Sequence, residues 1–279
     1  MNPKFSTIIP FYNGEKTLSR AIESAIDQAT QFFELILVND GSEDNSLQVA
    51  KSFLGDSRIS LHSIANHGVS AARNLGGAQA KGEWLLFLDA DDQLRPGFFQ
   101  ILKEEIAQAS HCDYLIFGIN RIKEKQEEIS LPANGHYFSR IPGTFVIKKS
   151  VFDQVGGYDE RFKFSENTEL FHRLALMGAK GKNIPWVSLN YYDNSSGGSK
   201  NLKNMVDSLS LFLDIHADTL SSHVKHLYHQ IIGVNFLRFR MFDDASFNFR
   251  KSLSYKFEIR TFMRYLLSRI PLIARKIYK

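Results

Sequence analysis

A chain of 279 residues can form one large α/β domain, or one domain with an extension. Hydrophobic and charged fractions of 43% and 23% are typical of globular proteins, and a single cysteine excludes an intramolecular disulfide and a cysteine zinc cluster. No apolar run approaches transmembrane length and no signal-peptide pattern opens the chain. We therefore expect a cytoplasmic protein, either free or peripheral on the inner face of the cell membrane. The net charge of +4 is concentrated in residues 250–279, which hold nine Lys/Arg and one acid.

The first 118 residues alternate short apolar runs with segments of helical spacing. Strands are predicted at 5–9, 33–38, 58–63, 82–88 and 113–118, and helices at 15–29, 44–53, 68–80 and 96–109. Pro10 is expected to break the first strand. The alternation predicts an α/β fold with a mostly parallel, Rossmann-like sheet and helices on both faces. Since carboxyl ends of parallel strands share one edge, Tyr12, Asp40, Asp89 and Asp91 should converge there.

The later residues predict an acceptor half and a helical extension. The charged segment 120–137 is interpreted as a hairpin or an excursion at the sheet edge. Strands at 144–147 and 184–192 and helices at 149–155 and 165–177 follow, and from residue 201 we expect three or four helices. The predicted domains are 1–199, with a nucleotide-binding half at 1–118 and an acceptor half at 119–199, and a C-terminal helical extension at 200–279.

Three carboxylates, Asp89, Asp91 and Asp92, directly follow the apolar run at 84–88. Like charges this close repel each other, and a divalent cation would remove that cost. Mg²⁺ or Mn²⁺ takes oxygen ligands and often bridges one or two carboxylates to a substrate's phosphates. The alternative is a solvated acidic turn that caps the helix beginning near Pro96.

Five motifs, in this order, resemble the inverting nucleotide-sugar glycosyltransferases of family 2, which have the GT-A fold. The motifs are IIPFYN at 8–13, LVNDGS at 37–42, GVSAARN at 68–74, FLDADD at 87–92, and GGYDE at 156–160 followed by SENTEL at 165–170. The resemblance covers residues 6–192. It implies a GT-A fold and a transferase that needs a divalent cation, Mn²⁺ or Mg²⁺. The Gly/Ser/Asn-rich segment 193–200, which we expect to be mobile, resembles the family's loop that closes over the bound donor, although it also fits an ordinary linker.

The same resemblance assigns roles to the acidic loop. Asp91 should ligate the metal, Asp89 should hold the ribose or assist the metal, and Asp92 should support them. The metal would stabilise the departing nucleotide diphosphate as a Lewis acid.

The nucleotide-binding positions are also implied by the resemblance. Asp40 matches the residue that hydrogen-bonds the base, commonly uracil, while Pro10 and Tyr12 match the loop that packs on the base. Arg73 matches a position that faces the nucleotide, where a guanidinium can pair with phosphate. The alternatives are a turn-fixing role for Asp40, a core position for Tyr12 and a helix-surface salt bridge for Arg73.

The catalytic base is the position at which this sequence departs from the family's pattern. The family usually supplies it from a Glu-Asp pair at the start of the helix predicted from residue 165, but here the pair reads Glu166-Asn167. Asn cannot accept a proton at neutral pH, so a base at Asn167 would be lost. We favour Glu166, with Glu169 and then Asp159 as substitutes. The alternative is that Glu166 and Glu169 are first-turn acids that stabilise a helix N-terminus.

The sequence thus predicts an enzyme that moves a sugar from a nucleotide donor, with a UDP-sugar favoured, to a glycan or lipid-linked glycan acceptor in surface polysaccharide or lipopolysaccharide synthesis. A catalytically impaired nucleotide-sugar-binding scaffold is the alternative, and Asn167 is its motive. A sugar nucleotidyltransferase would need a Gly-rich basic loop, which residues 10–14 lack.

The basic C-terminus carries an apolar stripe at helical spacing within residues 257–279. The stripe comprises Ile259, Phe262/Met263, Leu266, Ile270 and Ile273, with Arg260, Arg264, Arg275 and Lys276 off it. Such a helix fits an anionic membrane surface. It fits equally well against the catalytic domain or a second copy of the chain, so a homo-oligomer stays open. The tail lacks any motif that reads nucleic acid, so we expect no nucleic-acid partner.

Overall fold

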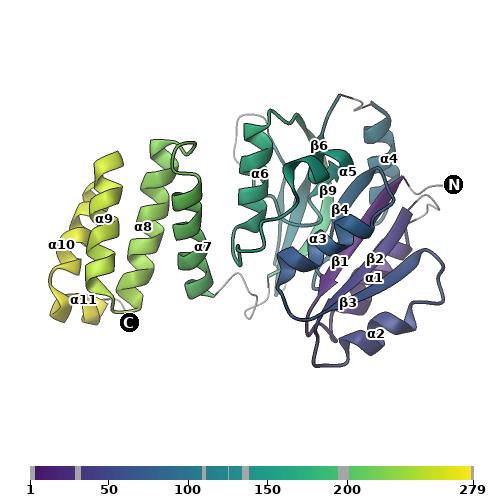
Figure 1. The fold of residues 1–279 in the computed structure, drawn as a ribbon, viewed down its shortest axis with the longest axis horizontal. Helices are drawn as coiled ribbons and strands as arrows, with labels where there is room; N and C mark the ends of the chain where they lie inside the picture. The colour runs from purple at the N-terminus through teal and green to yellow at the C-terminus, as the bar shows by residue number, and fades with distance from the viewer. Residues whose placement is uncertain are drawn as a thin grey trace. The chain divides into compact units, whose positions relative to one another are not determined.

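The computed structural model describes residues 4–28, 33–108, 111–124, 126–133, 138–193 and 201–277 (Figure 1). The chain divides into two compact units. The first, here the catalytic unit, comprises Met1–Glu160 and Glu166–Ser195, and the second, the helical unit, comprises Arg161–Ser165 and Ser196–Lys279. Beyond residue 193, the predicted closing loop lies outside the described residues.

The catalytic unit alternates strands and helices over its first half, as predicted. Its strands are β1 (Phe5–Phe11), β2 (Phe33–Asp40), β3 (Ile59–Ile64), β4 (Trp84–Phe87), β5 (Gln93–Leu94), β6 (Tyr114–Lys123), β7 (Gln126–Ser130), β8 (Phe145–Lys148) and β9 (Gly181–Tyr192). Its helices are α1 (Leu18–Ile26), α2 (Ser46–Ser52), α3 (Val69–Gln79), α4 (Phe98–Gln108), α5 (Lys149–Val155) and α6 (Glu166–Leu176).

Within the described residues these strands form one sheet in the order β3-β2-β1-β4-β8-β6-β9-β5, with β7 paired to β6. The pairs among β1 to β4 are parallel, and so is β6 with β9. β8 runs antiparallel to both β4 and β6, and β5 runs antiparallel to β9. The predicted α/β fold is confirmed. The described part of 120–137 forms the β6–β7 hairpin, the first of its two interpretations.

Alternate side chains of the central strands bury two separate cores. Ile9 of β1 and Leu37 of β2 pack with α1 and α4 on one face of the sheet. Their neighbours Ile8 and Val38 pack with α3, α5 and α6 on the other face. Strands buried on both faces read as continuous apolar runs, which is the pattern that the sequence showed.

The prediction that Pro10 breaks the first strand is wrong, because β1 continues to Phe11 and Pro10 pairs with Val38 of β2. Ile8 accepts a hydrogen bond from Leu88 on the β4 side, at 2.9 Å. Strand residues two apart direct their backbone groups to the same side, so the backbone nitrogen of Pro10 also faces the β4 side. The last residue pair between β1 and β4 is Ile8 with Phe87, so Pro10 lies beyond it. Its missing N–H therefore leaves no ladder bond unmade.

The helical unit contains α7 (Leu202–Ile215), α8 (Ser222–Arg238), α9 (Phe242–Tyr255), α10 (Ile259–Ser268) and α11 (Pro271–Ile277). The expectation of three or four helices is wrong, since residues 201–277 hold five. The predicted C-terminal stripe is divided where α10 ends and Pro271 begins α11. Leu237, Phe249 and Ala274 form one of the unit's small cores. No helix in the described part of the chain is both long and apolar enough to span a bilayer.

We predict that Gly76→Ala destabilises the catalytic unit, although Gly→Ala inside a helix normally stabilises. A Cβ at Gly76 would lie 2.3 Å from Cγ2 of buried Ile8, whose branched side chain has little freedom to move. We expect a loss of about 1–3 kcal/mol in urea unfolding. Trp84 and Trp186, the only tryptophans of the chain, both report on this unit by fluorescence.

Gly55→Ala is the control, because a Cβ at Gly55 meets nothing within 4 Å. It should leave the unfolding midpoint unchanged or slightly raised. Equal stability of the two variants would contradict the close contact between α3 and β1.

Candidate active site

The loops after β1 and β2 are bound to each other at the carboxyl edge of the sheet. The Asn13 side chain accepts a hydrogen bond from the backbone N–H of Glu43 at 2.8 Å, and Gly14 N–H donates to Ser46 Oγ at 2.7 Å. Tyr12 lies in this loop with 45% of its surface exposed. The core-aromatic alternative for Tyr12 is therefore wrong, and its ring is available to a ligand. Pro10, at the other side of Phe11, is buried within β1.

Asp40 ends β2 and holds a third loop. Its two carboxylate oxygens accept the backbone N–H groups of His67 and Gly68, each at 2.9 Å. The Asp40 side chain thus fixes the backbone just before α3. This role is similar to the turn-fixing alternative, but it acts on the loop that precedes α3 and not on the turn that follows Asp40. Carboxylate oxygens have lone pairs for more than one donor, so these bonds do not prevent Asp40 from accepting another.

The acidic loop brings three carboxyl groups close together, one of them buried. Asp92 is fully buried, and while its Oδ1 accepts the N–H of Tyr192 at 3.1 Å, its Oδ2 has no hydrogen-bond partner. Burial and the neighbouring Asp89 and Asp91 raise the pKa of Asp92 to about 9. Arg20 brings positive charge to this loop through a hydrogen bond to the carbonyl of Asp91. The solvated-turn alternative is wrong for Asp92.

Arg73 links the acidic loop to helix α6. Its side chain is 2% exposed, and its two terminal nitrogens donate to Asp89 Oδ1 at 2.6 Å and to Glu166 Oε1 at 3.0 Å. Burial opposes the charge, but Asp89 and the other acidic groups around the guanidinium raise the pKa of Arg73 above its ordinary value. The alternative, a salt bridge on the helix surface, is correct in that Arg73 pairs with carboxylates. It is wrong in placing the side chain on the surface, because Arg73 is buried. One buried cation thus holds two carboxylates from different elements.

Asn167 and Tyr158 form a hydrogen-bonded chain that ends at Glu166. Asn167 Nδ2 donates to Glu166 Oε1 at 3.2 Å, and its Oδ1 accepts the hydroxyl of Tyr158 at 2.9 Å. The Tyr158 ring lies under the guanidinium of Arg73, 5.3 Å from ring centroid to Cζ. Burial raises the pKa of Tyr158, so its hydroxyl remains a donor. The sequence interpretation assigned no role to Tyr158, although its signal was present in the GGYDE motif.

Glu169 is engaged elsewhere. Its carboxylate is 1% exposed and forms a two-pronged ion pair with Arg173, with both nitrogen–oxygen distances at 2.7 Å. Arg173 also donates to the carbonyls of Val155 and Gly157. The structure therefore brings Glu166, and not Glu169, together with Arg73 and Asp89.

The donor set of the acidic loop fits a divalent cation that shares its ligands with a substrate. Among the described residues, no group of three or more His, Cys, Asp or Glu side chains is placed to hold a metal by itself. Asp89 and Asp91 are only partly buried and carry oxygen ligands. The charges of Asp89 and Asp91 help to raise the pKa of the buried Asp92 carboxyl behind them, and a cation would relieve this repulsion. Mg²⁺ commonly combines one or two carboxylates with substrate phosphates in this way.

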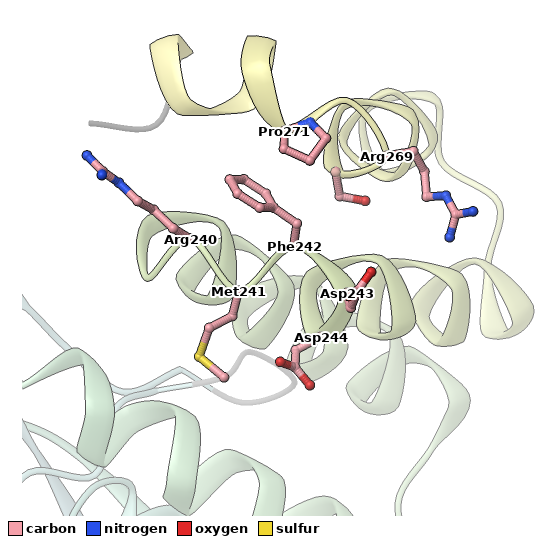
Figure 2. Close-up of a pocket in the computed structure, with 8 residues that line it drawn as sticks. Arg240, Met241, Phe242, Asp243, Asp244, Arg269 and Pro271 are labelled. Atoms are coloured by element: carbon pink, nitrogen blue, oxygen red, sulfur yellow. The ribbon is translucent and has the colours of Figure 1, made fainter.

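The helical unit has a cleft of its own, of about 510 Å³, at the start of α9 (Figure 2). It is lined by Arg240, Met241, Phe242, Asp243, Asp244, Ser268, Arg269 and Pro271. None of the predicted site residues lies there. In Figure 2, Phe242 points toward Pro271, while the Arg240 and Arg269 side chains extend away from the cleft on opposite sides. The candidate active site is thus the sheet edge and not this cleft.

Comparison with known families decides the assignment. The profile described as Glycosyl transferase family 2 matches residues 6–163, and a second, Glycosyltransferase like family 2, matches residues 119–233. The chain belongs to glycosyl transferase family 2. The first match contains the acidic loop, Asp40, Arg73 and Tyr158, and the second contains Glu166.

Relatives of this family 2 chain differ in length and role. It is 31% identical to the minor teichoic acid biosynthesis protein GgaA of Bacillus subtilis over 62% of this chain and 43% of that protein. It is 34% identical to the cholesterol galactosyltransferase of Borreliella burgdorferi over 44% of this chain and 36% of that one. The chain thus spans less than half of either relative.

A solved structure shares the fold of this family 2 chain. S. aureus TarS 1–349 in complex with UDP-GlcNAc superposes with a TM-score of 0.60 at 19% identity, covering 95% of this chain and 79% of that one. The recognised GT-A architecture is thereby confirmed.

We predict that Arg73→Met destabilises the catalytic unit by about 3 kcal/mol, because it leaves the carboxylates of Asp89 and Glu166 without their shared buried cation. Urea unfolding followed by tryptophan fluorescence measures the loss. Arg73→Lys should lose less, since it keeps the charge but not the two-armed geometry.

Arg58→Met is the matched control. Arg58 pairs with Asp56 at 2.6 Å, but both side chains are more than a quarter exposed. Its loss should stay below about 1 kcal/mol. If Arg73→Met were as mild as Arg58→Met, the buried bridge would not be a structural constraint.

Proposed function

We propose that this chain is a metal-dependent inverting glycosyltransferase that moves a sugar from a UDP-sugar to a glycan or lipid-linked glycan in surface polysaccharide or lipopolysaccharide synthesis. The bridge from Asp89 through Arg73 to Glu166 carries this proposal. It joins the acids suited to a metal-bound donor to an acid suited to activating an acceptor. The names of GgaA and the cholesterol galactosyltransferase support a surface-glycan or lipid acceptor, and the UDP-GlcNAc complex of TarS supports a UDP-linked donor.

In this proposal the loops at the sheet edge bind the nucleotide. Exposed Tyr12, with Pro10 behind it, packs on the base, and Asp40 accepts a hydrogen bond from the ring N–H. Asp91 and Asp89 hold the cation, Mn²⁺ or Mg²⁺, which stabilises the developing charge of the leaving diphosphate when bound. Arg73 keeps Asp89 in place and balances the charge of the acids around it.

Glu166 acts on the acceptor. As the acceptor oxygen forms its bond to the anomeric carbon, the Glu166 carboxylate takes the hydroxyl proton and the bond to the diphosphate oxygen breaks with inversion. Glu166 is 16% exposed, so it is reachable while its Oε1 is bound by Arg73 and Asn167. Asn167 orients this carboxylate and is not itself the base.

A nucleotide-sugar-binding scaffold is the second candidate, favoured by the Asn at position 167. The two functions differ in one observable. A scaffold binds UDP-sugars without releasing UDP, whereas the enzyme releases UDP in the presence of Mn²⁺.

The metal role predicts a thermal-shift result. UDP with Mn²⁺ should raise the unfolding midpoint of the wild type more than UDP alone, because bound ligand stabilises by mass action. Asp91→Asn should abolish the Mn²⁺-dependent part. Asp153→Asn, at a side chain that is 53% exposed and paired across one helix turn with Lys149, is the control. A full Mn²⁺ effect in Asp91→Asn would contradict the assignment.

The base role predicts that Glu166→Gln lowers UDP release by about 10²–10⁴-fold while UDP binding persists. The change removes proton acceptance but keeps the shape and the hydrogen bond from Arg73. Adding Asn167→Asp to this variant supplies a neighbouring carboxylate and should restore part of the rate. Wild-type release by Glu166→Gln would remove Glu166 from the role.

A further inference from the structure

Helix α10 turns its apolar side chains outward. Ile259, Met263, Leu266 and Ile270 follow one another at helical spacing along α10 and just past its end, and they are 62%, 58%, 41% and 47% exposed. The buried positions of the same helix are polar, since Thr261 is 0% and Ser268 2% exposed. A helix that only completes a bundle has the opposite polarity.

Polar contacts hold the inner side of α10. The Thr261 hydroxyl donates to Glu258 Oε2 at 2.8 Å and accepts from the Gln230 amide of α8. The Ser268 hydroxyl donates to the carbonyl of Tyr265 at 2.6 Å, and Tyr265 packs against the core of α8 and α9. The fold therefore satisfies the buried polar groups of α10 internally and packs Tyr265 and Leu267 against the core. It leaves the side chains of the outer apolar stripe uncovered.

The exposed apolar surface extends past both ends of α10. Phe257, 68% exposed, packs its ring on Phe262 at 5.9 Å. Leu272 at the start of α11 is 78% exposed. An exposed surface with this many large apolar side chains indicates an interaction site. We call the outward side chains of residues 257–272 the tail face.

The positive charge around the tail face favours an anionic partner. Residues 250–279 carry nine Lys/Arg against Glu258, a net charge of +8. Arg260 follows Ile259 and is exposed, whereas Arg264 is partly buried and lines a pocket with residues of α7 and α8. Two copies meeting through this face would bring like charges together, whereas an anionic surface attracts them.

We propose that the tail face binds the surface of a bilayer that contains anionic phospholipids. Apolar side chains enter the boundary between headgroups and acyl chains, and Arg260 beside them pairs with lipid phosphates. The proposal rests on α10 and α11 alone and does not depend on the catalytic assignment. Met263→Gln/Leu266→Gln removes two apolar side chains that the bundle does not use.

The test is co-sedimentation of the full chain with phosphatidylcholine vesicles, with and without phosphatidylglycerol. Wild type should sediment with the anionic vesicles and be released by added salt. The Met263→Gln/Leu266→Gln variant should bind at least about tenfold more weakly. Leu176→Gln/Met177→Gln is the matched control, because these side chains of the catalytic unit are 55% and 41% exposed. It should bind like wild type.

Three outcomes would overturn the proposal. They are no binding of wild type to anionic vesicles at low salt, equal loss in both double variants, and a wild-type dimer without lipid that Met263→Gln/Leu266→Gln dissociates. The last would show that the face pairs two chains. Thermal unfolding and circular dichroism of each variant confirm that the fold is unchanged, and light scattering measures the dimer.

Discussion

The candidate site depends on one buried cation between two carboxylates. Arg73 projects from α3 and binds Asp89 after β4 and Glu166 at the start of α6, although these residues are far apart in sequence. A buried arginine without partners would be very costly, so the loop and the helix must both be in place for the site to exist. The same ion pairs therefore fix the acidic loop, which we propose binds the metal, relative to Glu166, which we propose activates the acceptor.

Hydrogen bonds among the loops extend this constraint along the sheet edge. Asp40 binds the backbone before α3, and the loops after β1 and β2 bind each other. Asn167 connects Glu166 to the Tyr158 hydroxyl, and we propose that it orients Glu166 in place of the second acid that the resemblance led us to expect. In our proposal, a nucleotide bound at this edge meets polar groups that the loops already hold in place.

Much of this was predictable from the sequence, because the decisive patterns are local. Buried parallel strands gave continuous apolar runs, and the acidic loop after β4 lay where such sheets bind ligands. The interaction partners of Arg73, Glu169 and Tyr158 were not predictable, since packing between different segments of the chain determines them. The prediction at Pro10 was wrong because a missing N–H breaks a strand only where a neighbouring strand would have accepted its hydrogen bond. The sequence does not show where the neighbouring strand ends. The direction of the α10 stripe was left open for a related reason, because spacing locates an apolar stripe but does not say whether it faces inward.

The most direct test of the account is a crystal structure of the chain with UDP and Mn²⁺. We predict an ion bound to Asp91 and the diphosphate at the edge formed by β1, β2 and β4, with Arg73 still joining Asp89 to Glu166. An ion and nucleotide bound elsewhere, or Asp89 and Asp91 turned away from the diphosphate, would contradict the account.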